Sequence, residues 1–308
     1  MRNSFADKLV ELAQVDGDIY WLMGDLGFGV VDDFQEKFPD RLVNAGVAEQ
    51  NMTGVAAGLA LSGKVVFTYS IANFPTIRCL EQIRNDVCYH DLNVNIVSVG
   101  AGFSYGSLGS THHGTEDIAI LRSLPNMKVV VPADPIESEQ ATKALYEDDG
   151  PSYLRLGRSG EPDIHPQSFQ FELGKAAVVK NGTDLTFIGS GGVTYNAIQA
   201  ARKLEEVGHS IQVISAHTLK PFDRKAIIQA AKQTKKIITV EEHSNIGGLG
   251  SLVKEIIAEE KLSEVDLTAL DLDDKFTHEV GDQEYLREKN SLDPESLFNE
   301  AQNMLERR

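Results

Sequence analysis

The sequence predicts an α/β protein of two doubly wound domains, each with a mostly parallel sheet covered by helices on both faces. Two observations support this prediction. Short β-rich runs alternate with stretches of helical periodicity, and the strand-like runs are almost continuously apolar. Strands of that kind are buried on both faces, as they are in parallel sheets that lie between layers of helices.

The first alternation covers residues 1–158. Its strand-like runs are YWLMGDL, KVVFTYS, VNIVSVG, KVVVPAD and SYLRLGR, and helical patterns such as NMTGVAAGLAL and IESEQATKALYED lie between them. Strands joined by helical crossovers run parallel in one sheet. We therefore expect residues 1–158 to form the first domain.

The pattern loosens between residues 159 and 182, where prolines, glycines and mixed charges predict a crossing linker. A second alternation follows in residues 183–308. Its strand-like runs are LTFIGSG, SIQVISA, KIITVEE and VDLTALDL, with helices that start near Val193 and Asp223 and a last helical pattern in SLFNEAQNMLERR. These residues are expected to form the second domain.

Composition excludes several classes of function. The chain has 308 residues, 42% of them hydrophobic, which is enough for two separate cores. Its formal charge of −17 is spread over the whole length, so nucleic acid is not an expected partner. No apolar run approaches the length of a membrane span, and the first residues lack an apolar leader, which predicts a cytoplasmic protein without a membrane partner. Its two cysteines, Cys79 and Cys88, lack metal-ligand spacing, so we expect no metal site on this chain.

Seven segments contain most of the residues with chemical potential. In chain order they are MGDLGFG, GVAEQNM, YSIANF, GSLGSTHHG, RSLPNMKVVVPAD, RLGR and EEHSNIGGLGS. Together, in this order and at these separations, they resemble the C-terminal half of transketolases and 1-deoxyxylulose-5-phosphate synthases. The resemblance spans essentially the whole chain. It implies a domain that binds the pyrimidine of thiamine diphosphate, then a smaller C-terminal domain, in an enzyme that moves a two-carbon ketol unit between sugar phosphates.

Glu49, in GVAEQNM, is the first candidate for catalysis and cofactor binding. Thiamine diphosphate is activated through its own aminopyrimidine once a carboxylic acid serves the ring nitrogen N1′, so the protein has to supply one placed acid. The alternative is that Glu49 only complements the dipole of a helix that begins near Ala48. The other six segments favour the catalytic interpretation.

Aromatic side chains are expected near this acid, because an aminopyrimidine ring needs a flat apolar wall on which to stack. Phe74 and then Tyr69 follow the strand KVVFTYS, where the relatives place their stacking aromatics. Transketolases have a phenylalanine near the position of Ile71, so the correspondence is uncertain by a residue. Simple core packing at a strand end is the competing interpretation, more so for Tyr69.

His112 lies in the glycine-rich segment GSLGSTHHG. It matches the histidine of a Gly-x-Thr-His segment that contacts the cofactor and the donor substrate in the relatives, and a histidine can give and take protons near neutral pH. We expect His112 to be catalytic and His113 to be a bystander.

Two arginines match residues that bind the substrate phosphate in the family. Arg158 follows the strand SYLRLGR, at the sheet edge where ligands collect in α/β proteins, and its guanidinium suits phosphate geometry. Arg155 is the alternative, although strand alternation turns it to the opposite face. Arg2 is the second match, provided that the N-terminus is ordered.

Two departures from the family pattern bear on the substrate. Transketolases carry an aspartate that reads the sugar hydroxyls where this sequence has Leu108, three residues before Thr111. A second phosphate-contacting histidine, expected near Gly102, is also missing. The substrate is therefore expected to differ from the usual pentose phosphates.

The resemblance also implies a partner chain. Thiamine enzymes hold the diphosphate through Mg²⁺ on a Gly-Asp-Gly segment and a downstream asparagine, but Asp16-Gly17-Asp18 has the wrong order and no such asparagine follows. A separate subunit of the N-terminal transketolase type is expected to supply this segment and hold the Mg²⁺. An α2β2 assembly is the natural form, because the superfamily builds its sites across two-fold interfaces.

Three alternatives stay open at this point. One is a catalytically dead partner subunit, which the retention of Glu49 argues against. The β subunit of a 2-oxoacid dehydrogenase E1 component has a similar length and domain order, although RSLPNMKVVVPAD and RLGR look more like transketolase. A nucleotide-binding module is suggested by IGSGGVTYN, but Thr194 stands where a dinucleotide fingerprint needs its third glycine.

Overall fold

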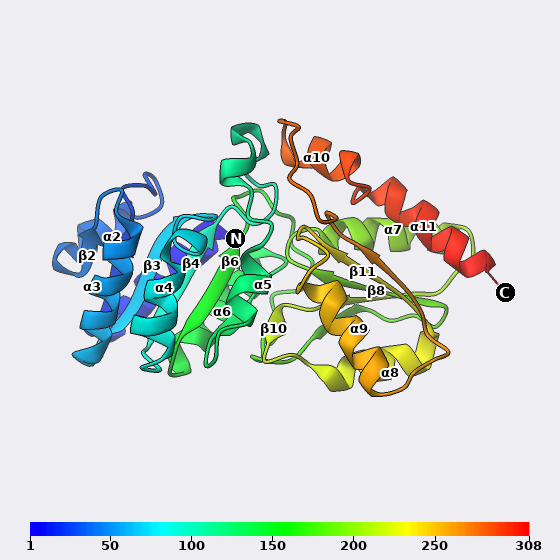
Figure 1. Cartoon of the computed structure of the whole chain (residues 1–308), viewed down its shortest axis with the longest axis horizontal. Coiled ribbons are helices and arrows are strands. Elements are labelled where there is room, and N and C mark those ends of the chain that lie inside the picture. Colours follow the sequence, from blue (N-terminus) through cyan, green and yellow to red (C-terminus); the bar gives the residue numbers. More distant parts are fainter. Residues whose placement is uncertain (308) are drawn as a thin grey trace.

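Two sheets lie side by side in the computed structural model, which describes residues 1–307 (Figure 1). The first sheet has the strand order β10-β5-β6-β4-β3-β1-β2, and the second has the order β12-β11-β8-β9-β7. Neighbouring strands are parallel except where the edge strands β10 and β7 pair with β5 and β9. The predicted fold class is confirmed.

The strands of the first sheet are β1 (Ile19–Met23), β2 (Leu42–Asn44), β3 (Val65–Ile71), β4 (Val94–Val99), β5 (Lys128–Val130), β6 (Ser152–Leu156) and β10 (Thr218–Lys220). Those of the second sheet are β7 (Ala177–Lys180), β8 (Leu185–Ser190), β9 (Ile211–Ser215), β11 (Lys236–Glu241) and β12 (Asp266–Leu270).

The α-helices are α1 (Arg2–Val15), α2 (Asp32–Lys37), α3 (Glu49–Leu61), α4 (Leu80–Gln82), α5 (Asp117–Arg122), α6 (Pro135–Glu147), α7 (Thr194–Glu206), α8 (Arg224–Thr234), α9 (Leu249–Glu259), α10 (Gln283–Lys289) and α11 (Pro294–Glu306). Short 3-10 turns are η1 (Pro39–Arg41), η2 (Ile77–Cys79), η4 (Gly106–Leu108) and η5 (Ser110–His112), and η3 (Ile83–Cys88) is a π-helical segment.

Aspartate caps start three of the long helices. Asp134, Asp223 and Asp293 stand at the N-caps of α6, α8 and α11 and accept hydrogen bonds from backbone N–H groups of the first turn. A proline follows directly in α6 and α11, where its missing N–H costs no helical hydrogen bond. These short-range signals fix where the helices begin.

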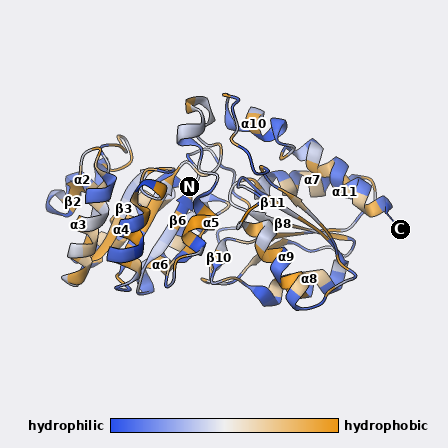
Figure 2. Ribbon diagram, viewed as in Figure 1, coloured by the Kyte–Doolittle hydropathy of each residue, from blue (hydrophilic) through white to orange (hydrophobic). Residues whose placement is uncertain are grey.

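Three apolar cores hold the sheets and helices together. One core packs α1 and α6 on one face of the first sheet, and another packs α7 and α11 on the second sheet. The third is shared, because it combines α3 and η3 of the first domain with α8 and α9 of the second. Figure 2 shows the same organisation, with orange stripes on helices that are blue on their outer faces. The two domains are therefore joined by a continuous core.

Three short strands were not predicted from the sequence. β2 follows η1 and pairs with β1 at one edge of the first sheet. β7 lies at the end of the expected linker, residues 159–182, where KAAVVK forms a half-exposed antiparallel edge strand. β10 belongs by sequence to the second half of the chain but pairs with β5 in the first sheet. In the part of the chain that the structure describes, no helix is long and apolar enough to span a membrane.

Candidate active site

Glu49 is the first residue of α3 and is almost completely buried, with 1% of its surface exposed. Its two carboxylate oxygens have different partners. Ser70 Oγ donates to Oε1 at 3.1 Å, and Arg78 Nη1 donates to Oε2 at 2.7 Å. A Cβ at Gly24 would lie 3.1 Å from Oε1, so the glycine leaves the carboxylate its space. Glu49 is thus a buried acid with its second oxygen directed at a half-exposed side chain.

Strand alternation explains why Ser70 and not Tyr69 contacts Glu49. Consecutive residues of β3 point to opposite faces of the sheet. Ser70 faces α3, whereas Tyr69 faces α1, where its ring stacks on Phe5 at 6.1 Å and meets Trp21 edge-on at 5.7 Å. Tyr69 is 1% exposed. These contacts agree with the competing interpretation of Tyr69 as a core residue, and its expected cofactor role stays a prediction.

Phe74 is linked to Glu49 by Arg78, which contacts both side chains. It follows β3 by three residues and is half-buried, and the Arg78 guanidinium carbon lies 4.4 Å from the centre of its ring. One guanidinium therefore contacts both the carboxylate of Glu49 and the ring of Phe74. A cation over an aromatic face is a favourable contact.

His112 joins the cluster through a contact with Phe74. It ends η5 in the glycine-rich loop, and its ring meets Phe74 edge-on with centroids 5.2 Å apart. Asn73 Nδ2 donates to the carbonyl oxygen of His113 at 2.8 Å and so ties the loop to the end of β3. Glu49, Phe74 and His112, which the sequence places in three separate segments, meet here with Arg78 between the first two.

The two adjacent histidines have different environments. His112 is half-buried, and its Nδ1 lies 3.0 Å from Thr111 Oγ1. His113 is buried against Phe103, and this burial lowers the pKa of His113. Only His112 therefore presents its imidazole at the cluster.

Packing between the domains explains one of the two departures noted above. Gly102 has φ +56, and a Cβ there would collide with Glu242 of the second domain. A histidine at this position has no room, because the glycine-rich loop approaches the second domain too closely. Leu108, the other departure, is 53% exposed at the end of η4.

The two arginines of β6 and its following loop have separate roles. Arg155 is 2% exposed and donates to Asp117 Oδ2 at 2.7 Å and to the carbonyls of Gly114 and Glu242. Its Nε and Nη2 are bonded inside the domain interface, so Arg155 is a buried structural residue of that interface. Arg158 is exposed, and its guanidinium lies over the Tyr105 ring at 5.4 Å. Within residues 1–307 Arg158 forms no ion pair.

Arg2 is ordered as the first residue of α1 and is half-buried. Its Nε donates to Asn3 Oδ1 at 3.4 Å. The condition that the sequence placed on Arg2, an ordered N-terminus, is met. It does not belong to the cluster of Glu49, Phe74 and His112.

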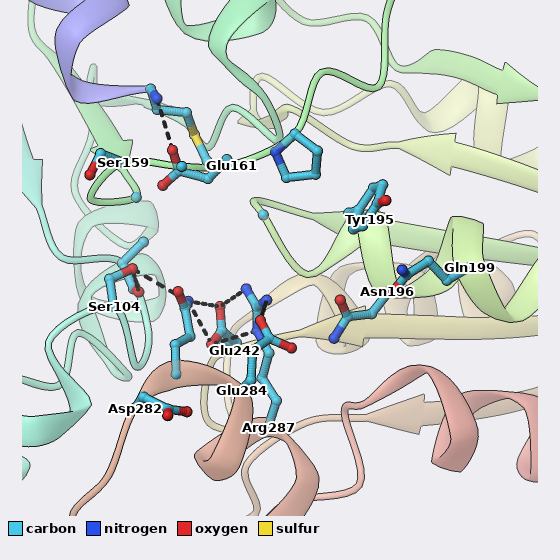
Figure 3. Close-up of a pocket in the computed structure, with 17 residues that line it drawn as sticks. Ser104, Ser159, Glu161, Tyr195, Asn196, Gln199, Glu242, Asp282, Glu284 and Arg287 are labelled. Carbon is cyan, nitrogen blue, oxygen red and sulfur yellow. Dashed lines mark hydrogen bonds and ion pairs between the residues drawn. The ribbon is translucent and has the colours of Figure 1, made fainter.

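A cavity of about 550 Å³ lies elsewhere, between the two domains (Figure 3). None of Glu49, Phe74, His112 and Arg158 lines it. Several of its charged groups are paired with one another: Arg287 donates to both oxygens of Glu242 and to Glu284, and Gln283 also donates to Glu242. The cavity is therefore a polar joint between the domains, in which Arg287 pairs with two of the lining acids.

Metal-binding residues do not gather in the described structure: residues 1–307 contain no group of three or more histidine, cysteine or acidic side chains arranged to hold an ion. Both cysteines are buried free thiols.

Sequence reasoning missed two residues of the cluster, Ser70 and Arg78. Ser70 follows from alternation once Tyr69 is assigned to the core. Arg78 carries a weaker signal, a lone positive charge in the otherwise apolar run ANFPTIRCL, four residues after Phe74. No spacing rule connects it to Glu49, which is 29 residues earlier.

The chain is similar to known proteins over nearly its whole length. Residues 1–162 match the family model "Transketolase, pyrimidine binding domain", and residues 174–296 match "Transketolase, C-terminal domain". The chain is 44% identical to one subunit of an apulose-4-phosphate transketolase of Phocaeicola vulgatus, over 84% of this chain and 83% of the relative. It is 37% identical to a 6-deoxy-6-sulfo-D-fructose transketolase subunit of Clostridium sp., over 100% and 95% of the two chains. Among solved structures, it is similar to a "split gene transketolase, inactive beta4 tetramer", with a TM-score of 0.88, 38% identity and coverage of 99% and 97%.

Proposed function

Since this chain belongs to the transketolase family of transferases, we propose that it is the pyrimidine-binding subunit of a two-chain transketolase that depends on thiamine diphosphate. The reaction is the transfer of a two-carbon ketol unit between sugar phosphates. One observation carries the proposal: the carboxylate of Glu49 is buried at the start of α3, with Phe74 and His112 gathered on the side that its Oε2 faces.

The cluster fits a flat ring with a basic nitrogen. Phe74 already has a planar cation on its face at 4.4 Å, so the ring accepts a stacked planar group. Glu49 has one oxygen held by Ser70 and the other bonded to that same cation. A pyrimidine stacked on Phe74 would therefore meet a carboxylate oxygen at its edge.

Each residue then has a distinct task. Thiamine diphosphate, when bound, supplies the stabilisation of negative charge on carbon that the transfer requires. Glu49 holds a proton at the pyrimidine nitrogen N1′, and Phe74 orients the ring by stacking. His112, half-buried at the end of η5 in the glycine-rich loop, gives and takes protons on the donor sugar.

The partner subunit holds the diphosphate and the Mg²⁺ through its Gly-Asp-Gly segment. Two observations on relatives support a two-chain enzyme: similar chains are named transketolase subunits, and the similar solved tetramer made of β chains is described as inactive. We propose an α2β2 assembly, because sites built across two-fold interfaces need two copies of each chain.

Sugar phosphates are the proposed substrates. Arg158 is exposed, is not neutralised by any acid in the described chain and lies beyond the carboxyl end of β6, so it can bind a substrate phosphate. Arg2 is the second candidate for this contact. Leu108 presents an apolar side chain in place of a carboxylate, which favours donors with one fewer hydroxyl contact than a pentose phosphate makes.

The test is reconstitution with the diphosphate-binding subunit. The purified complex is assayed for two-carbon transfer from a panel of ketose phosphates, with and without thiamine diphosphate and Mg²⁺. We expect turnover only with both chains and both cofactors. Pyruvate with an acyl acceptor is the contrasting substrate pair, and activity with that pair alone would replace the proposal by a 2-oxoacid dehydrogenase function. Turnover by this chain without a partner would contradict the two-chain site.

A further inference from the structure

Arg78 contacts the two groups that the proposed cofactor needs. Its Nη1 donates to Glu49 Oε2 at 2.7 Å, and its guanidinium carbon lies 4.4 Å from the centre of the Phe74 ring. The other carboxylate oxygen of Glu49 is bonded to Ser70. A cofactor ring that stacks on the face of Phe74 covered by Arg78 and reaches Glu49 Oε2 therefore competes with the Arg78 guanidinium for the same place.

The two competitors have similar chemistry. A guanidinium is flat, carries N–H donors and binds carboxylates and aromatic faces. An aminopyrimidine is also flat, and with a proton at N1′ it too is a cation with an N–H directed at a carboxylate. Arg78 satisfies the buried charge of Glu49 and the face of Phe74 in the same way as the pyrimidine would.

We propose that Arg78 is a placeholder: it keeps Glu49 and Phe74 in position in the cofactor-free subunit and leaves both when the pyrimidine binds. This inference rests on the proposed function. Arg78 is a positioning residue, since it acts on Glu49 and not on the substrate.

The surroundings allow this exchange. The Arg78 side chain is 43% exposed, whereas that of Glu49 is 1% exposed, so only the arginine can swing into solvent. Arg78 lies in η2, a single 3-10 turn, and the chain continues into the π-helical segment η3. Irregular helical segments of this kind mark functional sites. A buried carboxylate without a partner is costly, so the pair also protects the free subunit until the partner arrives.

The test compares Arg78→Met, Arg78→Lys and the exposed control Arg84→Met in the assembled complex. The dissociation constant of thiamine diphosphate is measured by calorimetry at fixed Mg²⁺. We expect R78M to bind the cofactor about tenfold more tightly than the wild type, because no cation has to be displaced. R78K, which keeps a charge but lacks the flat fork, should lie between the two, and R84M should match the wild type.

Unfolding of the free subunit by urea supplies a second readout that needs no cofactor. R78M should lower the urea midpoint because it leaves Glu49 buried and unpaired. R78K and the double variant E49Q/R78M should restore it, the first by returning a charge and the second by removing the need for one.

Weaker cofactor binding by R78M would overturn the placeholder, because it would mean that Arg78 stays in the loaded site as a cofactor ligand. Equal binding by R78M and the wild type would overturn it as well. If the wild-type complex bound no thiamine diphosphate, the proposed function and this inference would both fail. The three results are distinguishable in one calorimetric series.

Discussion

Both sheets place a buried glutamate at their carboxyl edge beside the start of a helix, and the two glutamates have different surroundings. Glu49 begins α3, and its Oε2 is bonded to the half-exposed Arg78. Glu241 ends β11 and caps α9, where its two oxygens accept the N–H groups of Leu249 and Gly250, both at 2.7 Å. Each glutamate is 1% exposed.

The two sheets differ in whether other parts of the chain cover their carboxyl edge. The first edge is left open, with Phe28, Val47 and Leu108 exposed on the loops that follow β1, β2 and β4. The second edge is closed by α10, whose Arg287 pairs with Glu242. Ligands collect at the carboxyl edge of parallel sheets, but only where the chain does not consume the edge with its own caps and ion pairs. A buried acid becomes a candidate for catalysis when one of its oxygens is left for a replaceable partner.

The largest expected effect separates the two glutamates by activity. Glu49→Gln should lower the turnover of the reconstituted complex by about 10²- to 10⁴-fold, because an amide cannot hold the proton at the pyrimidine. Glu241→Gln should keep turnover within about threefold, since Glu241 serves only the helix cap. Steady-state rates at saturating cofactor measure both. Equal losses in the two variants would break the distinction between an open and a closed edge.

The next largest expected effect is on stability and concerns Arg155, which lies at the interface between the two domains. Arg155→Met leaves Asp117 buried without its partner and removes hydrogen bonds to Gly114 and Glu242. Burial alone would raise the pKa of Asp117, but Arg155 holds it below its usual value. We expect a loss of about 3 to 5 kcal/mol in the free energy of unfolding. Lys203→Met, which breaks an exposed ion pair with Glu295, should cost less than about 1 kcal/mol. Urea denaturation that gave the two variants equal stability would contradict this assignment.

The closed edge should also respond to pH. Burial raises the pKa of Glu241 from 4.5 to about 7, even though two backbone N–H groups oppose the shift. The folded state therefore binds the extra proton, and the stability that this proton contributes is complete below about pH 4.5 and lost as pH rises through 7. Between pH 5 and pH 8 the wild type should lose roughly 2 to 3 kcal/mol more than Glu241→Gln. Urea unfolding at the two pH values measures this difference, and parallel curves would show that Glu241 is ionised throughout.

The smallest effect concerns the open edge and its aromatic wall. Phe74→Leu keeps an apolar side chain but removes the flat face, so cofactor affinity in the complex should fall by about two- to tenfold. Phe276→Leu changes a 70% exposed ring of the second domain and serves as the control. Calorimetric titration with thiamine diphosphate distinguishes them. An unchanged affinity in F74L would remove Phe74 from the site and leave the stacking residue unidentified.

Local pattern was sufficient for most of the fold. The long parallel strands were predictable because both of their faces are buried, which makes them continuously apolar, and helices α7 and α8 begin within a residue of Val193 and Asp223. The short strands β2, β7 and β10 have three or four residues and partly exposed sides, so they carry no such signal. Their pairing depends on tertiary contacts that no local window contains.

Three residues of the candidate site, Glu49, Phe74 and His112, were proposed from the sequence because each matches a position in the family's motifs. Glu49, Phe74 and His112 meet as three segments of that resemblance would require. Core packing, the competing interpretation of Tyr69, agrees with its place on the face of β3 opposite Ser70. The sequence does not predict the contact between Arg78 and Glu49, because an ion pair across 29 residues depends on how α3 packs against the segment after β3.

Strand β10 gives the molecule a property that neither sheet has by itself. It leaves the second half of the chain, pairs antiparallel with β5 and, through the bond from Val131 N to the His217 carbonyl, closes the outer edge of the first sheet. A polypeptide cut between the two family domains would expose that edge, and unpaired strand edges recruit other chains. The first sheet is therefore complete only when the C-terminal half of the chain is present.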